Sequence, residues 1–268
     1  MTDAAVRRHW LAALRAALSG SPKRLVYLDL FSGSGKVGNW LDRNSGYAVL
    51  RIDVAAHPAF DLSRRVCGAI VRGWLRARIV RGVMCAPPCS TWSQASRHFY
   101  RSLYALNGFS HLTGKAADRL RVGNATFHFA MRTGLECKRL GVPFVLENPR
   151  TSMMWSHPRM QLLSLTSCKD AIVYFCQHNT RWRKTTLFRG WCTCEPPRPL
   201  TYRCRGRGGV CSKTGLRHIS LEGGGPGGKR WTAIAEPYPT PVAAAAGLWL
   251  HRSAERRLSV RLSNLVSR

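Results

Sequence analysis

Short apolar runs alternate with stretches of helical spacing over the first two thirds of the chain. We predict short strands at residues 25–30, 47–53, 79–85 and 142–146. A Gly-rich turn and a short helix follow the first of these strands, and longer helices are predicted at residues 66–77 and 117–140. This alternation predicts an α/β fold in which helices cover a mostly parallel sheet.

Composition changes along the chain and suggests how it is divided. Residues 1–20 predict a basic amphipathic helix, although arginines on an apolar background also suit an organelle presequence. The strand–helix alternation occupies residues 21–188, whereas residues 189–229 are rich in Gly, Pro, Arg and Cys and predict a small irregular insertion. Residues 230–268 return to the main domain and end in a basic tail.

The first candidate site is the Gly-rich turn Asp29-Leu-Phe-Ser-Gly-Ser-Gly35. Glycines allow a tight turn and a close approach of the backbone to a ligand. Asp53 ends the second predicted strand, where a carboxylate can accept hydrogen bonds from the ribose hydroxyls of a nucleoside cofactor. A tight turn without a ligand is the alternative, and the lack of a Gly-Lys-Ser/Thr ending excludes a P-loop.

The second candidate is Cys89, which follows Pro87 and Pro88 just past a predicted strand. Two prolines fix the backbone and present the next side chain at the carboxyl edge of the sheet, where a thiolate can act as a nucleophile. Glu147 ends a further strand and is expected at the same edge, although a lone carboxylate there can also brace a loop. Four other cysteines are expected to be small buried residues: Cys67, Cys85, Cys137 and Cys168.

Together these residues resemble motifs I, IV and VI of the cytosine-C5 DNA methyltransferases. The matching segments have the family's order and similar spacing: Asp29-Leu-Phe-Ser-Gly-Ser-Gly35, Pro87-Pro-Cys89-Ser-Thr-Trp-Ser93 and Glu147-Asn148. Arg181-Trp-Arg183 resembles the family's Arg-x-Arg motif, and residues 230–239 are similar to its late Arg…Glu…Pro motif. The chain departs from the family's usual pattern at two positions: Ser90 stands where the family has Gln, and Pro149 stands where it has Val. With these departures, the chain resembles a divergent branch of the family.

The resemblance implies a Rossmann-like, S-adenosylmethionine-dependent methyltransferase fold with a small Cys-rich insertion. It implies that Cys89 adds to C6 of cytosine and that Glu147 hydrogen-bonds N3 and the exocyclic amine, so that C5 can take the methyl group. Arg183, with Arg181, would hold the O2 edge of the base. The residues implied for the cofactor site are Asp29, Phe31, Ser32, Gly33, Gly35, Asp53 and Pro87.

Three alternatives to DNA cytosine methylation stay open. The chain can be an RNA methyltransferase, or a methyltransferase of exocyclic amines, which would prefer an aromatic residue where Cys89 stands because it needs no covalent adduct. It can also be a catalytically degenerate methyltransferase fold that binds nucleic acid.

Charge makes nucleic acid the leading partner. The chain has 42 Lys and Arg against 13 Asp and Glu, a net charge of +29, and a polyanion would relieve the resulting self-repulsion. An anionic membrane surface competes less well, because the basic residues are scattered, and no apolar run approaches the roughly 20 residues of a membrane span. We expect phosphate contacts from four arginines of the insertion: Arg198, Arg203, Arg205 and Arg207.

The insertion also suggests a metal site. Its sulfur and imidazole groups can hold one tetrahedral zinc ion, with His178 as a further candidate ligand, and a loop with unpaired cysteines is the alternative. The ten cysteines do not suggest a secreted disulfide framework, so we expect a reducing intracellular compartment, the nucleus or wherever the nucleic acid lies. The predicted ligands are Cys192, Cys194, Cys204, Cys211 and His218.

Overall fold

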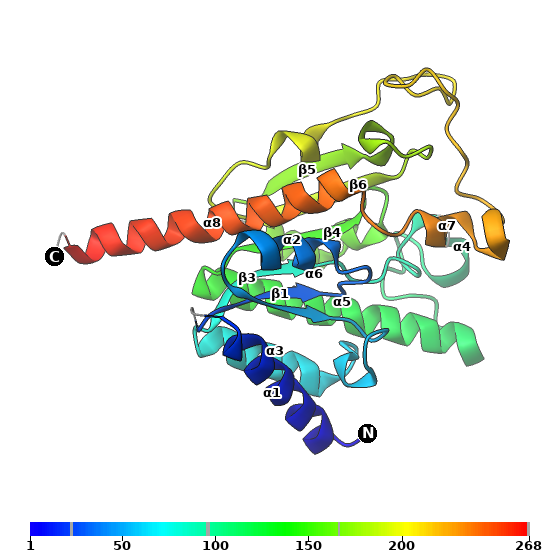
Figure 1. The fold of residues 1–268 in the computed structure, drawn as a ribbon. Helices are drawn as coiled ribbons and strands as arrows, with labels where there is room; N and C mark the ends of the chain where they lie inside the picture. The colour runs from blue at the N-terminus through cyan, green and yellow to red at the C-terminus, as the bar shows by residue number, and fades with distance from the viewer. Residues whose placement is uncertain (22–23, 95–96, 166, 267–268) are drawn as a thin grey trace.

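The computed structural model of the chain is an α/β structure built on one six-stranded sheet (Figure 1). It describes residues 1–21, 24–94, 97–165 and 167–266. The strand order across the sheet is β2-β1-β3-β4-β6-β5. The strands are β1 (Val26–Leu30), β2 (Ala48–Ile52), β3 (Val80–Cys85), β4 (Phe144–Pro149), β5 (Lys169–Tyr174) and β6 (Thr185–Trp191).

Most of the sheet is parallel. Strands β2, β1, β3 and β4 run in the same direction, whereas β6 is antiparallel to β4 and β5 is antiparallel to β6. The carboxyl ends of the four parallel strands therefore meet at one edge, where α/β sheets bind their ligands. The predicted α/β class is confirmed, and the arrangement is compatible with a Rossmann-like fold.

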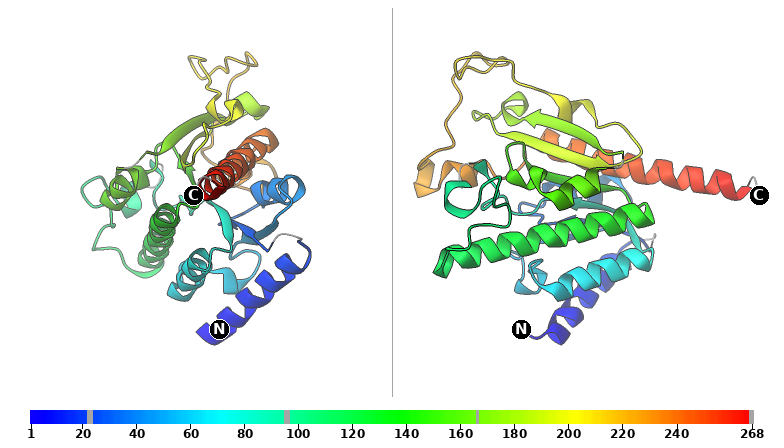
Figure 2. Two further views of the ribbon diagram at one scale, coloured as in Figure 1. Left: turned by 90° about the vertical axis from the view of Figure 1, so that its left-hand side faces the viewer. Right: turned by 180° about the vertical axis from the view of Figure 1, so that it is seen from behind.

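Helices cover both faces of the sheet, as the two further views show (Figure 2). The side chain of Leu28 packs in the core that also contains α1, α3, α5 and α6, and the neighbouring Tyr27 packs in the core that contains α2 and α8. This alternation is the two-residue period of a strand. The helices are α1 (Asp3–Ser19), α2 (Lys36–Asn44), α3 (Arg65–Arg76), α4 (Arg97–Tyr100), α5 (Gly114–Leu140), α6 (Pro158–Ser164), α7 (Trp231–Ile234) and α8 (Thr240–Val266).

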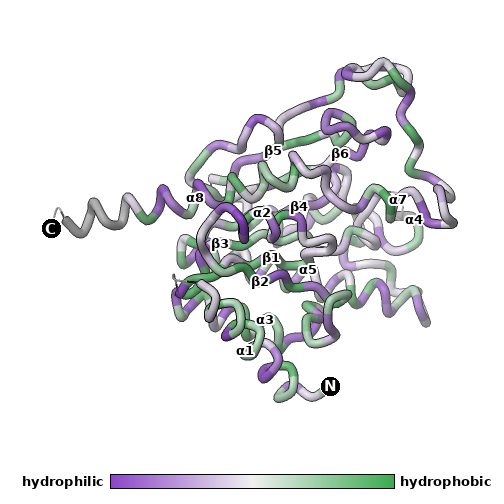
Figure 3. The backbone as a smooth tube through the Cα atoms, in the orientation of Figure 1, coloured by the Kyte–Doolittle hydropathy of each residue, from purple (hydrophilic) through white to green (hydrophobic). Residues whose placement is uncertain are grey.

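Local sequence explains where several helices begin and end. Thr2 caps α1 by accepting a hydrogen bond from Ala5 N at 3.3 Å. Gly141 ends α5 in the left-handed conformation (φ 62°), which glycine adopts at little cost. Hydrophobic residues concentrate along β1 and its neighbours at the centre of the molecule (Figure 3). No helix among the described residues is both long and apolar enough to span a membrane.

The antiparallel part of the sheet was not among the predicted elements. The segment that forms β5 begins with two charged residues, Lys169 and Asp170, and β6 contains Gly190, which weakens any strand prediction. β6 also continues to Trp191, which pairs with Phe144, so residues 189–191 belong to the sheet rather than to the insertion. The residues expected to form a basic tail continue α8 as far as Val266.

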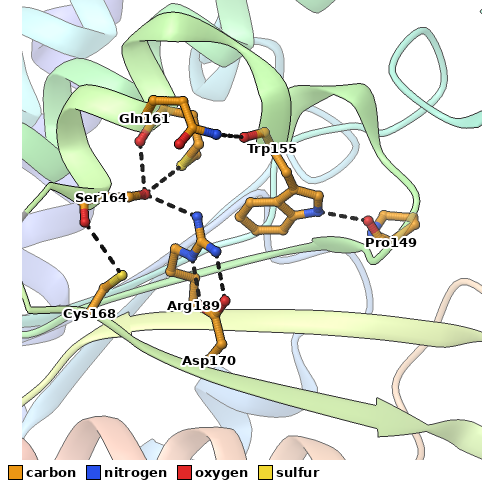
Figure 4. Close-up of polar contacts among 8 residues, drawn as sticks. Pro149, Trp155, Gln161, Ser164, Cys168, Asp170 and Arg189 are labelled. Carbon is orange, nitrogen blue, oxygen red and sulfur yellow. Dashed lines mark hydrogen bonds and ion pairs between the residues drawn. The ribbon is translucent and has the colours of Figure 1, made fainter.

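A polar network ties α6 to the antiparallel strands (Figure 4). The guanidinium of Arg189 donates to both carboxylate oxygens of Asp170, at 2.7 and 2.6 Å, and to the hydroxyl of Ser164 at 3.0 Å. It also lies 5.2 Å over the ring of Trp155, whose Nε1 donates to Pro149 O at 2.8 Å. The network fixes the chain immediately after β4, which is the strand that carries Glu147 and Asn148.

A substitution at Gly190 tests how closely α8 packs on the sheet. A Cβ atom at this position would lie 2.6 Å from the ring of Trp249 in α8, so Gly190→Ala should push that helix away and lower the free energy of unfolding by about 1 to 3 kcal/mol. Gly73→Ala in α3 is the matched control: it meets nothing within 4 Å and should stabilise by about 0.5 to 1 kcal/mol. Denaturant unfolding measures both, and equal effects would contradict the packing described.

Candidate functional site

The Gly-rich turn after β1 is held in shape by Asp53 at the end of β2. Gly33 (φ 49°) and Gly35 (φ 66°) have left-handed backbones, which is why glycine suits both positions. Oδ2 of Asp53 accepts from Gly33 N at 2.9 Å, and Oδ1 accepts from Ala55 N at 2.9 Å. The two segments that the sequence assigned to one cofactor site are therefore joined directly, and Asp53 stays partly exposed beside the turn.

Asp29 supports this turn from inside the protein. Its buried Oδ2 accepts from Gly38 N at 2.8 Å, and burial raises the pKa of the carboxyl to about 7 although that hydrogen bond and Arg51 lower it. A Cβ at Gly38 would lie 2.9 Å from the same oxygen, so only glycine allows this approach. Asp29 thus anchors the turn to α2.

Phe31 and Ser32 connect the turn to its surroundings. Phe31 has a left-handed backbone (φ 57°), and its ring packs edge-on against Phe129 of α5 at 5.7 Å between centroids. Ser32 N donates to Ile52 O at 3.2 Å. Lys36, the first residue of α2, donates from Nζ to Tyr238 O at 2.8 Å, which links this turn to the late motif of residues 230–239.

The Pro-Pro-Cys loop is pinned to the end of β4. Asn148, which is buried, donates from Nδ2 to Pro87 O at 2.9 Å. After Cys89 the chain forms a helical turn, in which Trp92 N and Ser93 N both donate to Cys89 O, at 2.9 and 2.8 Å. The structure therefore brings Cys89 and the Glu147-Asn148 pair to the same edge of the sheet.

A buried arginine holds the segment that follows Cys89. Arg101 donates to Thr91 O and Thr91 Oγ1, both at 2.8 Å, and to Leu106 O at 2.6 Å. Its guanidinium also bonds Asn124 Oδ1 at 3.0 Å and lies 3.5 Å from the centre of the Trp92 ring. Burial lowers the pKa of Arg101 to about 10. Nothing in the local sequence around Arg101 marks it as a buried cation, so it was not predicted as a site residue.

Glu147 has one partnered oxygen and one open oxygen. The hydroxyl of Tyr238 donates to Oε2 at 2.9 Å, whereas the buried Oε1 has no hydrogen-bond partner among the described residues. Burial raises the pKa of this carboxyl, while the cation of Lys184 and the Tyr238 hydrogen bond lower it. A buried acceptor without a partner is costly, so Oε1 is suited to a ligand.

Lys184 is the cation that faces both Cys89 and Glu147. Burial raises the pKa of the Cys89 thiol, the charges of Glu147 and Glu236 raise it further, and Lys184 lowers it. The ammonium is fixed by hydrogen bonds to the carbonyl oxygens of Ala235 at 3.3 Å and Glu236 at 3.4 Å. Lys184 directly follows the Arg181-Trp-Arg183 motif in the sequence but was not itself predicted as a site residue.

The two arginines of that motif lie on the surface. Both Arg181 and Arg183 are exposed. The guanidinium of Arg183 lies 4.9 Å over the ring of Tyr174, and the carbonyl of Arg181 accepts from Ile219 N at 2.8 Å. The four arginines expected to contact phosphate are also exposed: Arg198, Arg203, Arg205 and Arg207.

Three cysteines and one histidine form a group that can hold a metal ion such as zinc. One ligand atom from each of Cys176, Cys204, Cys211 and His218 lies within 4.8 Å of all the others. Cys204 Sγ and His218 Nε2 are 3.7 Å apart, and the amide nitrogen of Gln177 contacts the sulfurs of Cys176 and Cys211 at 3.6 and 3.7 Å. Sulfur and imidazole ligands in a tetrahedral set are typical of structural zinc sites.

The surroundings of two of the three cysteines in this group lower the pKa of the thiol and so favour the thiolate form. Burial raises the pKa of Cys211, but hydrogen bonds from Lys213 N and Thr214 N outweigh it and bring the pKa down to about 6. The pKa of Cys204 is also lowered, against the effect of burial, by donors that include Ser212 N. Burial raises the pKa of Cys176 to about 12.

This group differs from the predicted ligand set. Cys204, Cys211 and His218 are brought together, but Cys192 packs in the core with α8, and Cys194 bonds that helix through Ser253 and Trp249. His178 contacts Pro199 O at 2.9 Å and stacks on Tyr202. Cys176 was missed because it follows an apolar run, Ala171-Ile-Val-Tyr-Phe, and so resembles a core residue.

Comparisons with known proteins provide no family for this chain. No protein-family model matches it, and no curated protein matches it. Its function is therefore inferred from its residues and their geometry.

Tyr238→Phe tests the hydrogen bond that holds Glu147. We expect the pKa of Glu147 to rise further, because the carboxylate loses a donor that favours its charged form while it stays buried. Carbon-13 NMR titration of labelled glutamate carboxyl groups measures this shift. Tyr202→Phe, which alters an exposed ring stacked on His178, is the control and should leave Glu147 unchanged. An unaltered Glu147 pKa in Tyr238→Phe contradicts the arrangement.

Proposed function

We propose that the protein is an S-adenosylmethionine-dependent methyltransferase that acts on C5 of cytosine in DNA. The observation that carries this proposal is the hydrogen bond from Asn148 to Pro87 O, which joins the Cys89 loop to the end of β4 next to Glu147. Oε2 of Glu147 is held by Tyr238, and its buried Oε1 has no partner among the described residues. A nucleophile beside a carboxyl group with one open oxygen suits covalent addition to a base that the carboxyl group also binds.

The raised pKa of Glu147 fits a contact with cytosine N3. N3 is a hydrogen-bond acceptor, so it needs a donor, and burial favours the protonated carboxyl group that can donate from Oε1. As the thiolate adds to the ring, negative charge develops at N3, and the same contact becomes stronger. Glu147 therefore stabilises the covalent adduct more than the free base.

The proposed reaction at Cys89 is balanced in electrons and protons. The thiol first loses its proton, which Lys184 favours because its positive charge stabilises the thiolate. Sγ forms a bond to C6, and C5 becomes nucleophilic. C5 would then take the methyl group as the bond between that methyl group and the cofactor's sulfur breaks, with its electrons left on a neutral thioether, and a base would remove the C5 proton. The electrons of the C5–H bond restore the C5–C6 double bond as the Sγ–C6 bond breaks. The contact of Arg183 and Arg181 with the O2 edge stays a prediction.

The Gly-rich turn fits a nucleoside cofactor. S-adenosylmethionine would supply a methyl group carried on a positively charged sulfur. A Cβ at Gly33 would meet nothing within 4 Å, so the backbone there is open to a ligand. Asp53 accepts two backbone hydrogen bonds and has further lone pairs for ribose hydroxyls. We assign the cofactor to this turn, with Phe31, Ser32 and Pro87 beside it and Asp29 as its buried support.

DNA is proposed as the substrate because of charge and chemistry together. The net charge of +29 favours a polyanion, and cytosine C5 requires a covalent nucleophile whereas an exocyclic amine does not. The target base must leave the duplex to reach the half-buried Cys89.

A DNA duplex with 5-fluorocytosine at the target positions tests this mechanism. Fluorine replaces the C5 hydrogen that a base must remove, so the reaction stops at the covalent adduct. We expect a denaturation-resistant protein–DNA adduct that requires S-adenosylmethionine and is lost in Cys89→Ser. The matched control is Cys194→Ser, which alters a half-buried thiol outside the site and should form the adduct normally.

Each other outcome of the adduct experiment indicates a different function. An adduct that forms with RNA containing 5-fluorocytosine, but not with the DNA duplex, indicates an RNA methyltransferase. Cofactor binding without an adduct on either nucleic acid favours methylation of an exocyclic amine. Nucleic-acid binding without cofactor binding leaves a degenerate methyltransferase fold that only binds.

We also propose that the group of Cys176, Cys204, Cys211 and His218 holds a structural zinc ion. The three sulfurs and one imidazole match the ligand preference of zinc, and all four positions are taken by protein groups, as in sites without catalytic water. The buried Nδ1 of His218 has no hydrogen-bond partner among the described residues, and its Nε2 contacts the sulfur of Cys204, another member of the group. The ion would join the end of β5 to the loop of residues 204–218.

Zinc analysis of purified protein tests this second proposal. We expect one zinc ion per chain, lost in Cys204→Ser and retained in Cys192→Ser, because Cys192 lies outside the group. Zinc at a thousandfold its Kd would stabilise the fold by about 4 kcal/mol, so chelation should lower Tm by about 10 °C. Equal zinc content in both variants would contradict the assignment.

A further inference from the structure

A pocket lined with arginines lies between α3 and α5, apart from Cys89. Its volume is about 290 Å³. Arg65 and Arg72 line it from α3, and His128 and Arg132 line it from α5. These positions repeat at helical spacing, so both helices direct cationic side chains into the same hollow. No part of the proposed catalytic mechanism uses this pocket.

The positive charge of the pocket is largely unpaired. In the described part of the chain, neither Arg65, Arg72 nor Arg132 forms an ion pair. Burial lowers the pKa of Arg72, and repulsion from Arg132 and Arg76 lowers it further, against the attraction of Glu136. An anion that enters the pocket would compensate the buried and repelled charge of Arg72, and this compensation favours its binding.

The nearby acidic groups already have partners. Glu136 accepts from Arg76 and Arg139, each at 2.8 Å, and Asp3 pairs with Arg64 at 2.7 Å. The remaining acid close to the pocket, Asp61, bonds the hydroxyl and the backbone of Ser63, at 2.6 and 3.0 Å. The pocket therefore has a local excess of positive charge.

Arg159 of α6 brings a further positive charge next to His128. Its guanidinium approaches Nδ1 of His128 at 3.4 Å. Burial lowers the pKa of His128, and the charges of Arg159 and Arg132 lower it further, so the imidazole stays neutral near pH 7. The guanidinium groups, which are always charged, provide the attraction, and their donors match phosphate oxygens in pairs.

The position of the pocket relates it to the proposed active site. Phe129, which lines the pocket, packs against Phe31 of the Gly-rich turn. Nearer the start of α5, the carbonyl oxygen of Gly123 accepts a hydrogen bond from Trp92 in the Cys89 loop. Nine residues separate Gly123 from Arg132, which is about 14 Å of helix. That is about four steps of B-form duplex, counted at roughly 3.4 Å each.

We propose that this pocket binds a backbone phosphate of the nucleic acid, a few nucleotides from the base that reaches Cys89. The proposal rests on the proposed function, because it takes nucleic acid as the substrate. The pocket fixes the position of the strand and carries no sequence information, since phosphate contacts orient a duplex without reading its bases.

The test compares two variants that remove the same charge. Arg72→Gln/Arg132→Gln alters the pocket, and Arg7→Gln/Arg8→Gln alters two exposed arginines of α1. Fluorescence anisotropy with an unmodified DNA duplex, without cofactor, gives the affinity over a series of salt concentrations. Each phosphate contact contributes about 0.9 to the slope of log K against log salt. We expect the pocket variant to lower the magnitude of this slope by about 0.9, as for one phosphate, and the α1 variant to leave it unchanged.

A further variant, Arg132→Glu, leaves Arg72 unaltered, so its effect on binding cannot come from a change in how Arg72 packs. Arg132 is an exposed helix position, so this variant should fold normally and weaken duplex binding more than the α1 variant does. Equal losses in the pocket and α1 variants would overturn the proposal, because diffuse charge would then account for binding. A pocket that binds inorganic pyrophosphate but whose loss leaves duplex affinity intact would also overturn it, in favour of a small free anion.

This experiment can fail separately from the proposed catalytic function. It measures binding without cofactor, and Cys89→Ala should keep the full salt slope. A protein that forms the fluorocytosine adduct but shows no pocket-dependent slope is a methyltransferase that uses other phosphate contacts.

Discussion

Burial of one carboxyl group, that of Glu147, is the constraint around which the candidate active site is organised. The group lies at the end of β4, where the parallel part of the sheet meets the antiparallel part. Removing a carboxyl group from water is unfavourable unless charge and hydrogen bonds compensate. Compensation comes from Lys184, just before β6, and from Tyr238, just before α8. The site is therefore complete only when both segments have packed against β4.

This dependence connects distant parts of the chain. Lys184 is itself held by the carbonyl groups of Ala235 and Glu236, and Lys36 holds the carbonyl of Tyr238 from the other side. The loop that carries Tyr238 thus bridges the Gly-rich turn and the end of β4. If the proposed ligands bind at the turn and at Cys89, this loop would link the two sites, because it contacts both.

The sequence predicted the parallel half of the fold well, for a physical reason. Buried parallel strands are short continuous apolar runs, and a glycine or proline follows them where the chain turns, as at Gly33 and Pro87. Local patterns of this kind identified Cys89, Glu147 and Asp53. The antiparallel strands, Lys184 and Cys176 escaped prediction, because their roles depend on contacts with residues far away in the chain. A buried arginine such as Arg101 cannot be distinguished by sequence from an exposed one.

The zinc site proposed for Cys176, Cys204, Cys211 and His218 would impose an order on the assembly of the protein. Cys176 lies in the short 3-10 helix directly after β5, whereas Cys204, Cys211 and His218 come from the loop that follows β6. A short local finger can gather its ion while the rest of the chain is unfolded, but this group cannot, because its first ligand is positioned by the sheet. Capture of the proposed zinc ion would therefore be a late event in folding. A chain in which β5 is misplaced would keep its thiols free and accessible to oxidation, so the group also discriminates between correctly and incorrectly folded molecules.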